Sequence, residues 1–150
     1  MDLTSASFAG GWIPDEFTCH GAGISPLLAW SAPPAGTRSF ALIVTDPDAP
    51  GRIFTHWTLY DLPAETRALA EGLPAQDQLA NGARQGRNDF GRIGYGGPCP
   101  PGDTAHHYVF KLYALNEKLN LPPGATRSQI ESAMQSHVLT CGELTALYRH

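Results

Sequence analysis

Three segments of the chain combine apolar, β-branched and aromatic residues as β-strands do, and they limit the fold most strongly. Residues 39–46 (SFALIVTD) are almost continuously apolar, which is typical of a strand buried on both faces. Residues 53–62 and 106–115 are the other two segments. The chain also has 16 glycines and 13 prolines, which favour many turns over long helices. The sequence therefore predicts a single, mainly β domain over residues 1–150.

The segments around these strands predict turns and one long connection. Residues 7–36 are interrupted by glycine and proline, so we expect short strands and turns there and no helix. Residues 63–87 are polar and mixed, and we expect a long surface connection that contains at most one helical turn, at 64–72. Residues 144–148 are expected to form a last strand or a short helical turn.

One helix is expected near the end of the chain. A capping box, either TRSQ at 126–129 or SQIE at 128–131, marks its start, and the predicted helix covers 127–139. Its apolar stripe is predicted to consist of Ile130, Met134 and Val138.

The charge balance excludes two classes of partner. The net charge is −4 at pH 7 and the chain has no basic run, so neither a nucleic acid nor an anionic membrane surface is expected as the main partner. No apolar run approaches the roughly 20 residues that cross a bilayer, so no integral membrane segment is expected. Residues 1–11 lack the basic and apolar regions of a signal peptide, and the expected location is cytoplasmic.

Cys19, Cys99 and Cys141 form an odd set without a CxxC motif. Reduced thiols are the simpler expectation for a cytoplasmic protein, and one disulfide is left open. Cys99 stands between two prolines, so it could be exposed and act as a nucleophile with His106 as its base. A buried, unreactive thiol is the more common state of such a residue.

Acidic and imidazole side chains stand near the ends of the first two strands. Asp46 and Asp48 belong to DPDAP at 46–50, where the prolines end the first strand and where an aspartate commonly bonds its own backbone. The sequence leaves open whether the Ala49–Pro50 bond is cis. Alternation along the second strand predicts one face with Phe54, His56, Thr58 and Tyr60 and the other face with Trp57 and Leu59.

A stiff loop with three prolines, Pro98, Pro100 and Pro101, leads into the third strand. Alternation places His106 and Tyr108 on one face of this strand and His107 on the other. A lone histidine or tyrosine on a strand is more often a hydrogen-bonded structural residue than a ligand. The functional interpretation therefore requires that groups from all three strands meet in space.

If they meet, imidazole and phenol donors could bind the oxygens of an anion such as phosphate, with a carboxylate orienting one imidazole and the loop prolines as walls. A metal site is disfavoured, because no HxH or HxxxH pair is present and the rings of His106 and His107 point to opposite faces. An enzyme is the alternative, with His56 or His106 as general acid–base on a small substrate and Asp46 orienting the imidazole.

The order and spacing of several motifs resemble the phosphatidylethanolamine-binding protein family, also called Raf kinase inhibitor proteins. These motifs are TDPDAP at 45–50, HW at 56–57, GYGGPCPPG at 94–102 and HHY at 106–108. The GPCPP form, together with ISPLLAW at 24–30, PPAGTRSFALIV at 33–44 and the closing SHVLTCGELTALYR, resembles the bacterial and archaeal YbhB/YbcL-type branch. The similarity covers nearly the whole chain.

The resemblance implies an antiparallel β-sandwich with one or two peripheral helices and a small pocket at one end, which in the family accepts phosphate, phosphoryl head groups and similar anions. The pocket residues that it implies are Asp46, Asp48, Pro50, His56, Pro100, His106 and Tyr108. No cofactor and no metal are expected.

Two features depart from the family's pattern. The usual His-Arg-Tyr is His106–His107–Tyr108 here, so the arginine is missing from the face that points away from the pocket. The pocket should persist, whereas any partner or salt bridge that the arginine served is in doubt. The chain also ends at His150 without the extra C-terminal helix of the mammalian members, so their ligand preference is not carried over.

The leading expectation is a non-enzymatic protein that binds a small phosphorylated or anionic ligand and regulates a protein partner such as a kinase or a protease. The connection at 63–87 is the candidate surface for such a partner. The bacterial relatives also suggest a homodimer.

Overall fold

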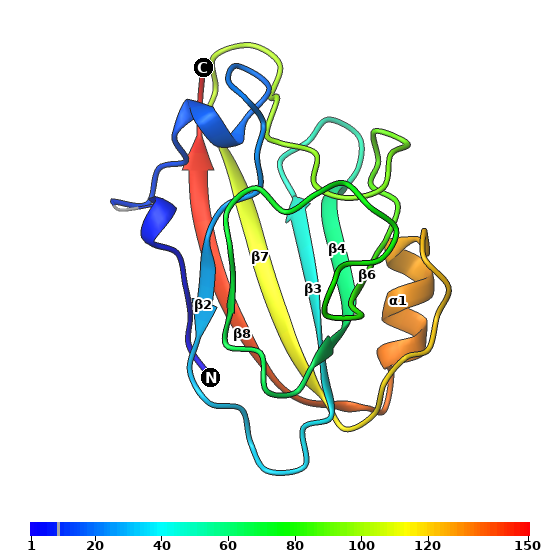
Figure 1. The fold of residues 1–150 in the computed structure, drawn as a ribbon. Helices are drawn as coiled ribbons and strands as arrows, with labels where there is room; N and C mark the ends of the chain where they lie inside the picture. Colours follow the sequence, from blue (N-terminus) through cyan, green and yellow to red (C-terminus); the bar gives the residue numbers. More distant parts are fainter. Residues whose placement is uncertain (9) are drawn as a thin grey trace.

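The computed structural model describes residues 1–8 and 10–150 (Figure 1). Over these residues the chain forms two antiparallel sheets and one α-helix, which confirms the predicted mainly β sandwich. The strands are β1 (Leu3–Thr4), β2 (Leu28–Trp30), β3 (Ser39–Asp46), β4 (Phe54–Pro63), β5 (Ala68–Leu69), β6 (Arg84–Gln85), β7 (His106–Leu115) and β8 (Val138–Tyr148), and the helix is α1 (Arg127–Met134). The small sheet has the order β1-β2-β5 and the large sheet the order β6-β4-β3-β7-β8.

The central strands follow the sequence pattern closely. β3 and β7 have the predicted bounds, and β4 lies one residue further along than 53–62. β8 is longer than the predicted segment 144–148, because its whole length pairs with β7 from His106↔Tyr148 to Leu115↔Val138. This pairing makes β8 a long strand at the edge of the large sheet.

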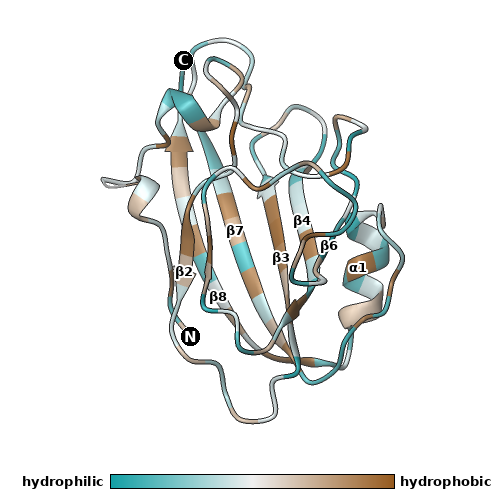
Figure 2. Cartoon of the chain, in the orientation of Figure 1, coloured by the Kyte–Doolittle hydropathy of each residue, from teal (hydrophilic) through white to brown (hydrophobic). Residues whose placement is uncertain are grey.

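The main core lies between the two sheets. Trp30 of β2 meets Phe40 of β3 with ring centroids 5.5 Å apart, and Trp57 and Leu59 of β4 are fully buried in the same cluster. Figure 2 shows the hydrophobic colours concentrated along β3 and, in alternation with polar positions, along β7. Burial of both faces of β3 agrees with its nearly continuous apolar sequence.

A second, smaller core lies on the other face of the large sheet, under α1. Ile130 and Met134 of the helix pack with Ile43 of β3, Tyr60 of β4 and Leu115 of β7. In Figure 1 the helix lies at the β6 side of the large sheet. Neither core covers the ends of the large sheet, where loops connect the strands.

The helix begins as predicted but ends earlier. The Thr126 side chain accepts a hydrogen bond from the Gln129 N–H, and the Gln129 side chain accepts one from the Thr126 N–H, so the capping box at 126–129 is confirmed. The predicted extent of 127–139 is wrong, because Ser136 has a φ of 75° and turns the chain toward β8. Val138 therefore belongs to β8 and is 44% exposed instead of lying in the helical stripe.

Two other local predictions need correction. Residues 7–36, where no helix was expected, contain a short 3₁₀ segment at Asp15–Phe17 and the end of another at Ala6–Phe8. Residues 63–87 contain no helical turn at 64–72; after a turn closed by Thr66 N–H and Pro63 O, this stretch supplies β5, and later β6. Pairing with β2 decides the conformation of β5, because Leu28 is opposite Leu69.

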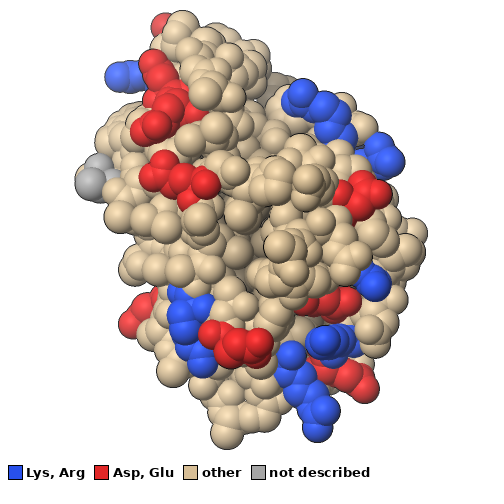
Figure 3. Space-filling model, viewed as in Figure 1, with Lys and Arg blue, Asp and Glu red and all other residues tan. Residues whose placement is uncertain are grey.

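Charged side chains on the face drawn in Figure 3 lie in small groups of both signs, separated by uncharged surface. Within residues 1–8 and 10–150, no helix is both long and apolar enough to cross a membrane.

Candidate functional site

A cavity of about 330 Å³ lies at one end of the large sheet. Because β3 runs antiparallel to both β4 and β7, the last residues of β3 lie beside the first residues of the other two strands at this end of the sheet. Six of the seven predicted pocket residues line the cavity, namely Asp46, Pro50, His56, Pro100, His106 and Tyr108. The other lining residues are Ala49, Arg52, Phe54, Phe90, Cys99 and Pro101.

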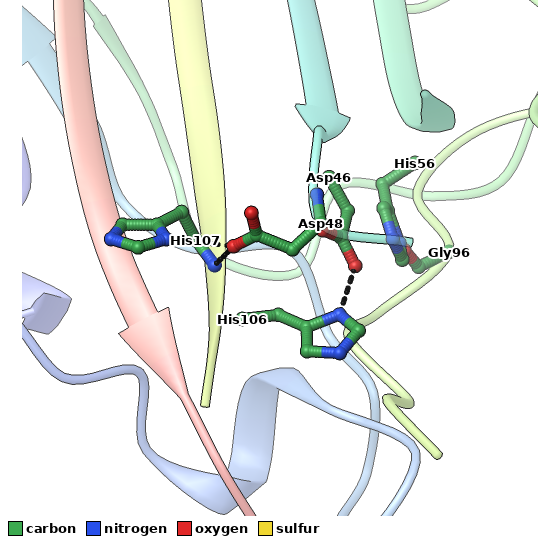
Figure 4. Close-up of polar contacts among 6 residues, drawn as sticks. All are labelled: Asp46, Asp48, His56, Gly96, His106 and His107. Carbon is green, nitrogen blue, oxygen red and sulfur yellow. Dashed lines mark hydrogen bonds and ion pairs between the residues drawn. The ribbon is translucent and has the colours of Figure 1, made fainter. Parts of the chain in front are cut away.

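Asp46 and His106 form a buried pair in the cavity wall (Figure 4). His106 Nδ1 lies 2.7 Å from Asp46 Oδ2, and the two side chains are 8% and 5% exposed. Since a carboxylate oxygen only accepts, the shared proton is on Nδ1, and the Nε2 atom is left for the cavity. The other carboxylate oxygen, Oδ1, accepts the Asp48 N–H at 2.8 Å. The carboxylate therefore fixes the orientation of the imidazole.

A β-bulge places His56 in the cavity. The register shifts from Val44↔Trp57 to Thr45↔Thr55, so His56 is the extra residue of β4. At such a bulge the alternation of side chains is interrupted, and His56 lies on the same face as Trp57. The predicted common face with Thr58 and Tyr60 is therefore wrong. The bulge instead brings His56 close to the cavity rings described next.

Rings from three segments surround His56. Its ring centroid is 4.9 Å from that of Phe54, 5.5 Å from that of Phe90 and 5.3 Å from that of Tyr108. His56 Nδ1 donates to the Gly96 carbonyl at 2.7 Å, while Nε2 has no hydrogen-bond partner among the residues that the structure describes. Burial lowers the pKa of His56, because the charged imidazolium loses hydration there.

The Tyr108 hydroxyl is a buried donor without a partner. The residue is 1% exposed, and no atom of residues 1–8 or 10–150 meets the distance and angle of a hydrogen bond with the hydroxyl, although the Asp46 carboxylate lies near it. Burial, and secondly the nearby charge of Asp46, raise the pKa of Tyr108, so the phenol keeps its proton. Buried hydroxyl groups normally have partners. An acceptor in the cavity would supply the missing one.

Asp48 does not line the cavity. Its Oδ2 accepts hydrogen bonds from both the backbone N–H and the Nδ1 of His107, each at 2.7 Å (Figure 4). The hydrogen bond from this backbone N–H is the main reason why the pKa of Asp48 is lowered. The His107 side chain is 56% exposed and lies outside the cavity lining, as alternation predicted. The structure thus separates two Asp–His pairs, one inside the cavity wall and one at the surface.

Sequence reasoning missed Arg52, Phe54 and Phe90 as cavity residues. The Arg52 guanidinium lies 5.4 Å from the Phe54 ring centroid and 3.3 Å from Asp89 Oδ2. Phe54 could have been predicted, because alternation places it on the same face of β4 as His56. Arg52 and Phe90 lie in loops whose path follows no periodic pattern, so nothing in the sequence placed them here.

Three prolines and Cys99 also line the cavity. Pro100 and Pro101 line the cavity and Pro98 does not. The Ala49–Pro50 bond is trans.

The expectation of reduced thiols is wrong for two cysteines, because Cys99 forms a disulfide with Cys19, while Cys141 is free and exposed. In the disulfide, Cys99 has no thiolate and does not act as a nucleophile.

The cavity thus offers hydrogen-bond donors and one cation. Tyr108 provides a neutral O–H, and the Arg52 guanidinium is 57% exposed at the side. The Nε2 atoms of His106 and His56 donate only when the ring carries a second proton, which the lowered pKa of His56 disfavours for that ring. Within the described chain, no three His, Cys, Asp or Glu side chains are arranged to hold a metal ion. Such a donor set fits an anion of a few oxygen atoms.

Comparisons with known proteins agree with this fold. The family model of the phosphatidylethanolamine-binding protein matches residues 4–149. A UPF0098 protein of Aquifex aeolicus is 49% identical over 152 residues, which cover 99% of this chain and 88% of the relative. The UPF0098 protein YbcL of Escherichia coli is 41% identical over 97% of this chain and 79% of the relative.

Two solved structures are similar over almost their whole length. The crystal structure of E. coli YbcL, described as a new member of the mammalian PEBP family, has a TM-score of 0.91 with 37% identity and covers 99% of this chain and 98% of that chain. The phosphatidylethanolamine-binding protein homologue CT736 of Chlamydia trachomatis has a TM-score of 0.90 with 39% identity, and covers 99% and 97%. This chain belongs to the phosphatidylethanolamine-binding protein family.

Proposed function

We propose that this protein binds small phosphate-type anions in the cavity at the end of the large sheet. The observation that carries the proposal is the Tyr108 hydroxyl, a buried donor without a hydrogen-bond partner in the described chain, on a residue that lines the cavity. An anion oxygen would accept this hydrogen bond and satisfy the hydroxyl.

The neighbouring groups support an anion over a cation or a neutral ligand. Asp46 is the only carboxylate in the described cavity lining, and its oxygens are engaged by His106 and by the Asp48 N–H. Arg52 adds a positive charge at the side, which its ion pair with Asp89 partly offsets. The cavity is small and open, so we expect dissociation constants of about micromolar to millimolar.

Titration of the protein with inorganic phosphate, followed by NMR, tests the proposal. Shift changes are expected around His56, His106 and Tyr108 in the wild type and are expected to be lost in His106→Ala. His107→Ala is the matched control, because the adjacent imidazole lies outside the cavity lining. Equal shift changes in His106→Ala and wild type, or no change in the wild type at millimolar phosphate, would contradict the proposal.

The Asp46–His106 pair also favours a second candidate function, general acid–base catalysis on a small phosphoryl or carbonyl substrate. A carboxylate that orients an imidazole, with the second ring nitrogen left for the cavity, is an arrangement that proton transfer uses. Turnover of a phosphoester, an ester or an enolisable metabolite, lost in His106→Ala, would support this function. Binding of these compounds without turnover would favour the anion-binding function.

Regulation of a protein partner, such as a kinase or a protease, and assembly of a homodimer stay predictions. A pull-down that His106→Ala leaves unchanged would assign partner binding to a surface such as 63–87 rather than to the cavity. Sedimentation equilibrium tests the dimer directly.

The cytoplasmic location also stays a prediction, and the disulfide bears on it. Disulfides persist mainly in oxidising compartments. Alkylation of free thiols at the moment of cell lysis, followed by mass spectrometry, reports the state of Cys19 and Cys99 in cells. A reduced pair would support the cytoplasm, and an oxidised pair would argue against it.

A further inference from the structure

We propose that the anion cavity continues into a second subsite at Arg92, and that the favoured ligands are phosphate monoesters whose organic part carries a second anionic group. This inference rests on the proposed phosphate site and names the class of ligand that the site selects. Three observations support it: a groove beside the cavity, an Arg92 guanidinium without a counterion, and the charges that line the groove and the cavity.

The groove has a volume of about 300 Å³ and shares two walls with the anion cavity, Phe90 and Cys99. Its other walls include Arg92, Tyr95 and Gly96. The shared walls make the two spaces neighbours, with the ring of Phe90 at their boundary. A ligand that crosses this ring contacts both.

Glycine fixes the position of the boundary ring. A Cβ atom on Gly96 would collide with the Phe90 ring, so the ring packs directly against the Gly96 backbone. Contact with Phe54, at a centroid distance of 4.8 Å, holds the ring from the cavity side. Phe90 is nevertheless 40% exposed, so it offers apolar surface to the organic part of a ligand.

Arg92 is a positioned cation without a counterion. Its guanidinium carbon lies 5.4 Å from the centroid of the Phe90 ring, and its side chain makes no hydrogen bond or ion pair within residues 1–8 and 10–150. Arg52, the cation of the first cavity, differs because it is paired with Asp89. Arg92 is therefore the cation that is free to receive an anionic group.

The distances suit one small molecule. The centroid of the Phe90 ring is 5.4 Å from the Arg92 guanidinium carbon and 5.5 Å from the His56 ring centroid. Arg92 and His56 are therefore no further apart than the sum of these two distances. A phosphate near His56 and a carboxylate near Arg92 are within the reach of a chain of a few carbon atoms.

The charge pattern selects against a ligand with an amine. Arg92 is the only charged side chain in the described lining of the groove. Beside the cavity, the Asp46 carboxylate already binds His106, and the Asp89 carboxylate binds Arg52 and the Thr55 N–H. In the groove an ammonium group would therefore meet the Arg92 cation and no lining carboxylate, whereas a carboxylate would meet a guanidinium, its best bidentate partner.

Three phosphate monoesters of similar size test the inference by calorimetric titration at low ionic strength: 3-phosphoglycerate with a carboxylate, glycerol 3-phosphate with an uncharged tail, and phosphoethanolamine with an amine. The wild type should bind 3-phosphoglycerate about threefold to tenfold more tightly than glycerol 3-phosphate, because an exposed ion pair is a modest gain. Phosphoethanolamine should bind most weakly.

Arg92→Gln should abolish this preference, with the affinity for 3-phosphoglycerate falling to that for glycerol 3-phosphate. Arg38→Gln is the control, because it removes the same charge from an exposed arginine just before β3, at the opposite end of the sheet. Binding of all three esters without preference, or a preference that survives in Arg92→Gln, overturns the second subsite alone. Failure of all three to bind overturns the phosphate site as well.

Discussion

The rings of His56 and Tyr108 meet edge to face, with centroids 5.3 Å apart and an angle of 78° between their planes. They come from strands that do not pair with each other, since β3 lies between β4 and β7. The bulge at His56 makes the contact possible, because it turns the imidazole to the face that Tyr108 occupies. One extra residue in β4 thereby joins an imidazole, whose pKa burial lowers, to a phenol without a partner.

Tyr108→Phe should weaken phosphate binding about tenfold or more, because it removes a donor to a charged acceptor. The free energy of unfolding should stay unchanged or rise by up to about 1 kcal/mol, because a buried unpaired hydroxyl is lost. Phosphate titration and chemical denaturation measure the two effects.

Tyr60→Phe is the control for this prediction. The Tyr60 hydroxyl donates to the Pro122 carbonyl and accepts the Ala125 N–H, away from the cavity. This variant should lose about 1 kcal/mol of stability and keep its phosphate affinity. A loss of stability in Tyr108→Phe comparable with that in Tyr60→Phe would show that the Tyr108 hydroxyl is not unpaired.

The stability of the protein should decrease as the pH falls below 6.5, the ordinary pKa of histidine. Burial lowers the pKa of His56 in the folded state, so between this lowered value and 6.5 the unfolded chain binds more protons than the folded chain. The contribution of His56 has a slope of at most about 1.4 kcal/mol per pH unit. Denaturation curves over a pH series measure it.

His56→Asn should reduce this slope, because asparagine retains an N–H donor for the Gly96 carbonyl and does not titrate. The control is His137→Asn, which removes an imidazole that lies at the surface beside Asn116. An unchanged slope in His56→Asn would mean that other groups cause the pH dependence.

Loss of the disulfide should destabilise the protein by about 2–5 kcal/mol, because the Cys19–Cys99 bond closes a loop with a sequence separation of 80 residues. Cys19→Ser and Cys99→Ser should show this loss, while Cys141→Ser, at an exposed free thiol, should change stability by less than about 0.5 kcal/mol. Denaturation under non-reducing conditions measures the difference.

Thiol titration of the unfolded protein checks the same bond independently. One reactive thiol is expected before reduction and three afterwards, since Cys141 alone is free among the three cysteines. Three thiols before reduction would contradict the pairing.

Asp46→Ala and Asp48→Ala should differ strongly although only one residue separates them. Asp46→Ala leaves His106 buried without its partner and should cost about 3–5 kcal/mol. Asp48→Ala breaks a surface pair with His107 and should cost about 0–1 kcal/mol. Denaturation curves test this order. An equal cost for the two variants would contradict the expectation that burial makes the Asp46–His106 pair the more important one for stability.

Phosphate titration of Asp48→Ala asks a separate question. Because Asp48 lies outside the cavity lining, the variant should bind phosphate like the wild type. A loss of binding would restore Asp48 to the site in which the family resemblance placed it.

Periodicity and proline placement determined the three central strands. β3 and β7 could be predicted to the residue because a strand buried between neighbours requires apolar side chains along its length or on alternate positions. The same alternation predicted that His106 and Tyr108 lie on the cavity face of β7 and that His107 lies on the other face. The start of α1 could also be predicted, because the capping box that determines it involves backbone donors and side chains within only four residues.

Contacts between distant segments decided the rest. The end of α1 depends on how Val138 enters β8, and the face of His56 depends on a bulge that appears only when β4 pairs with β3. The sequence by itself determined the three central strands, the start of α1 and that Asp46, His56, His106 and Tyr108 could meet. Only the tertiary structure decided that Cys19 reaches Cys99, that Asp48 turns away from the cavity, and that Phe90 and Arg92 lie beside it. The reason is physical: periodicity reports the neighbours along a strand, whereas loop paths and register shifts depend on packing between residues far apart in the chain.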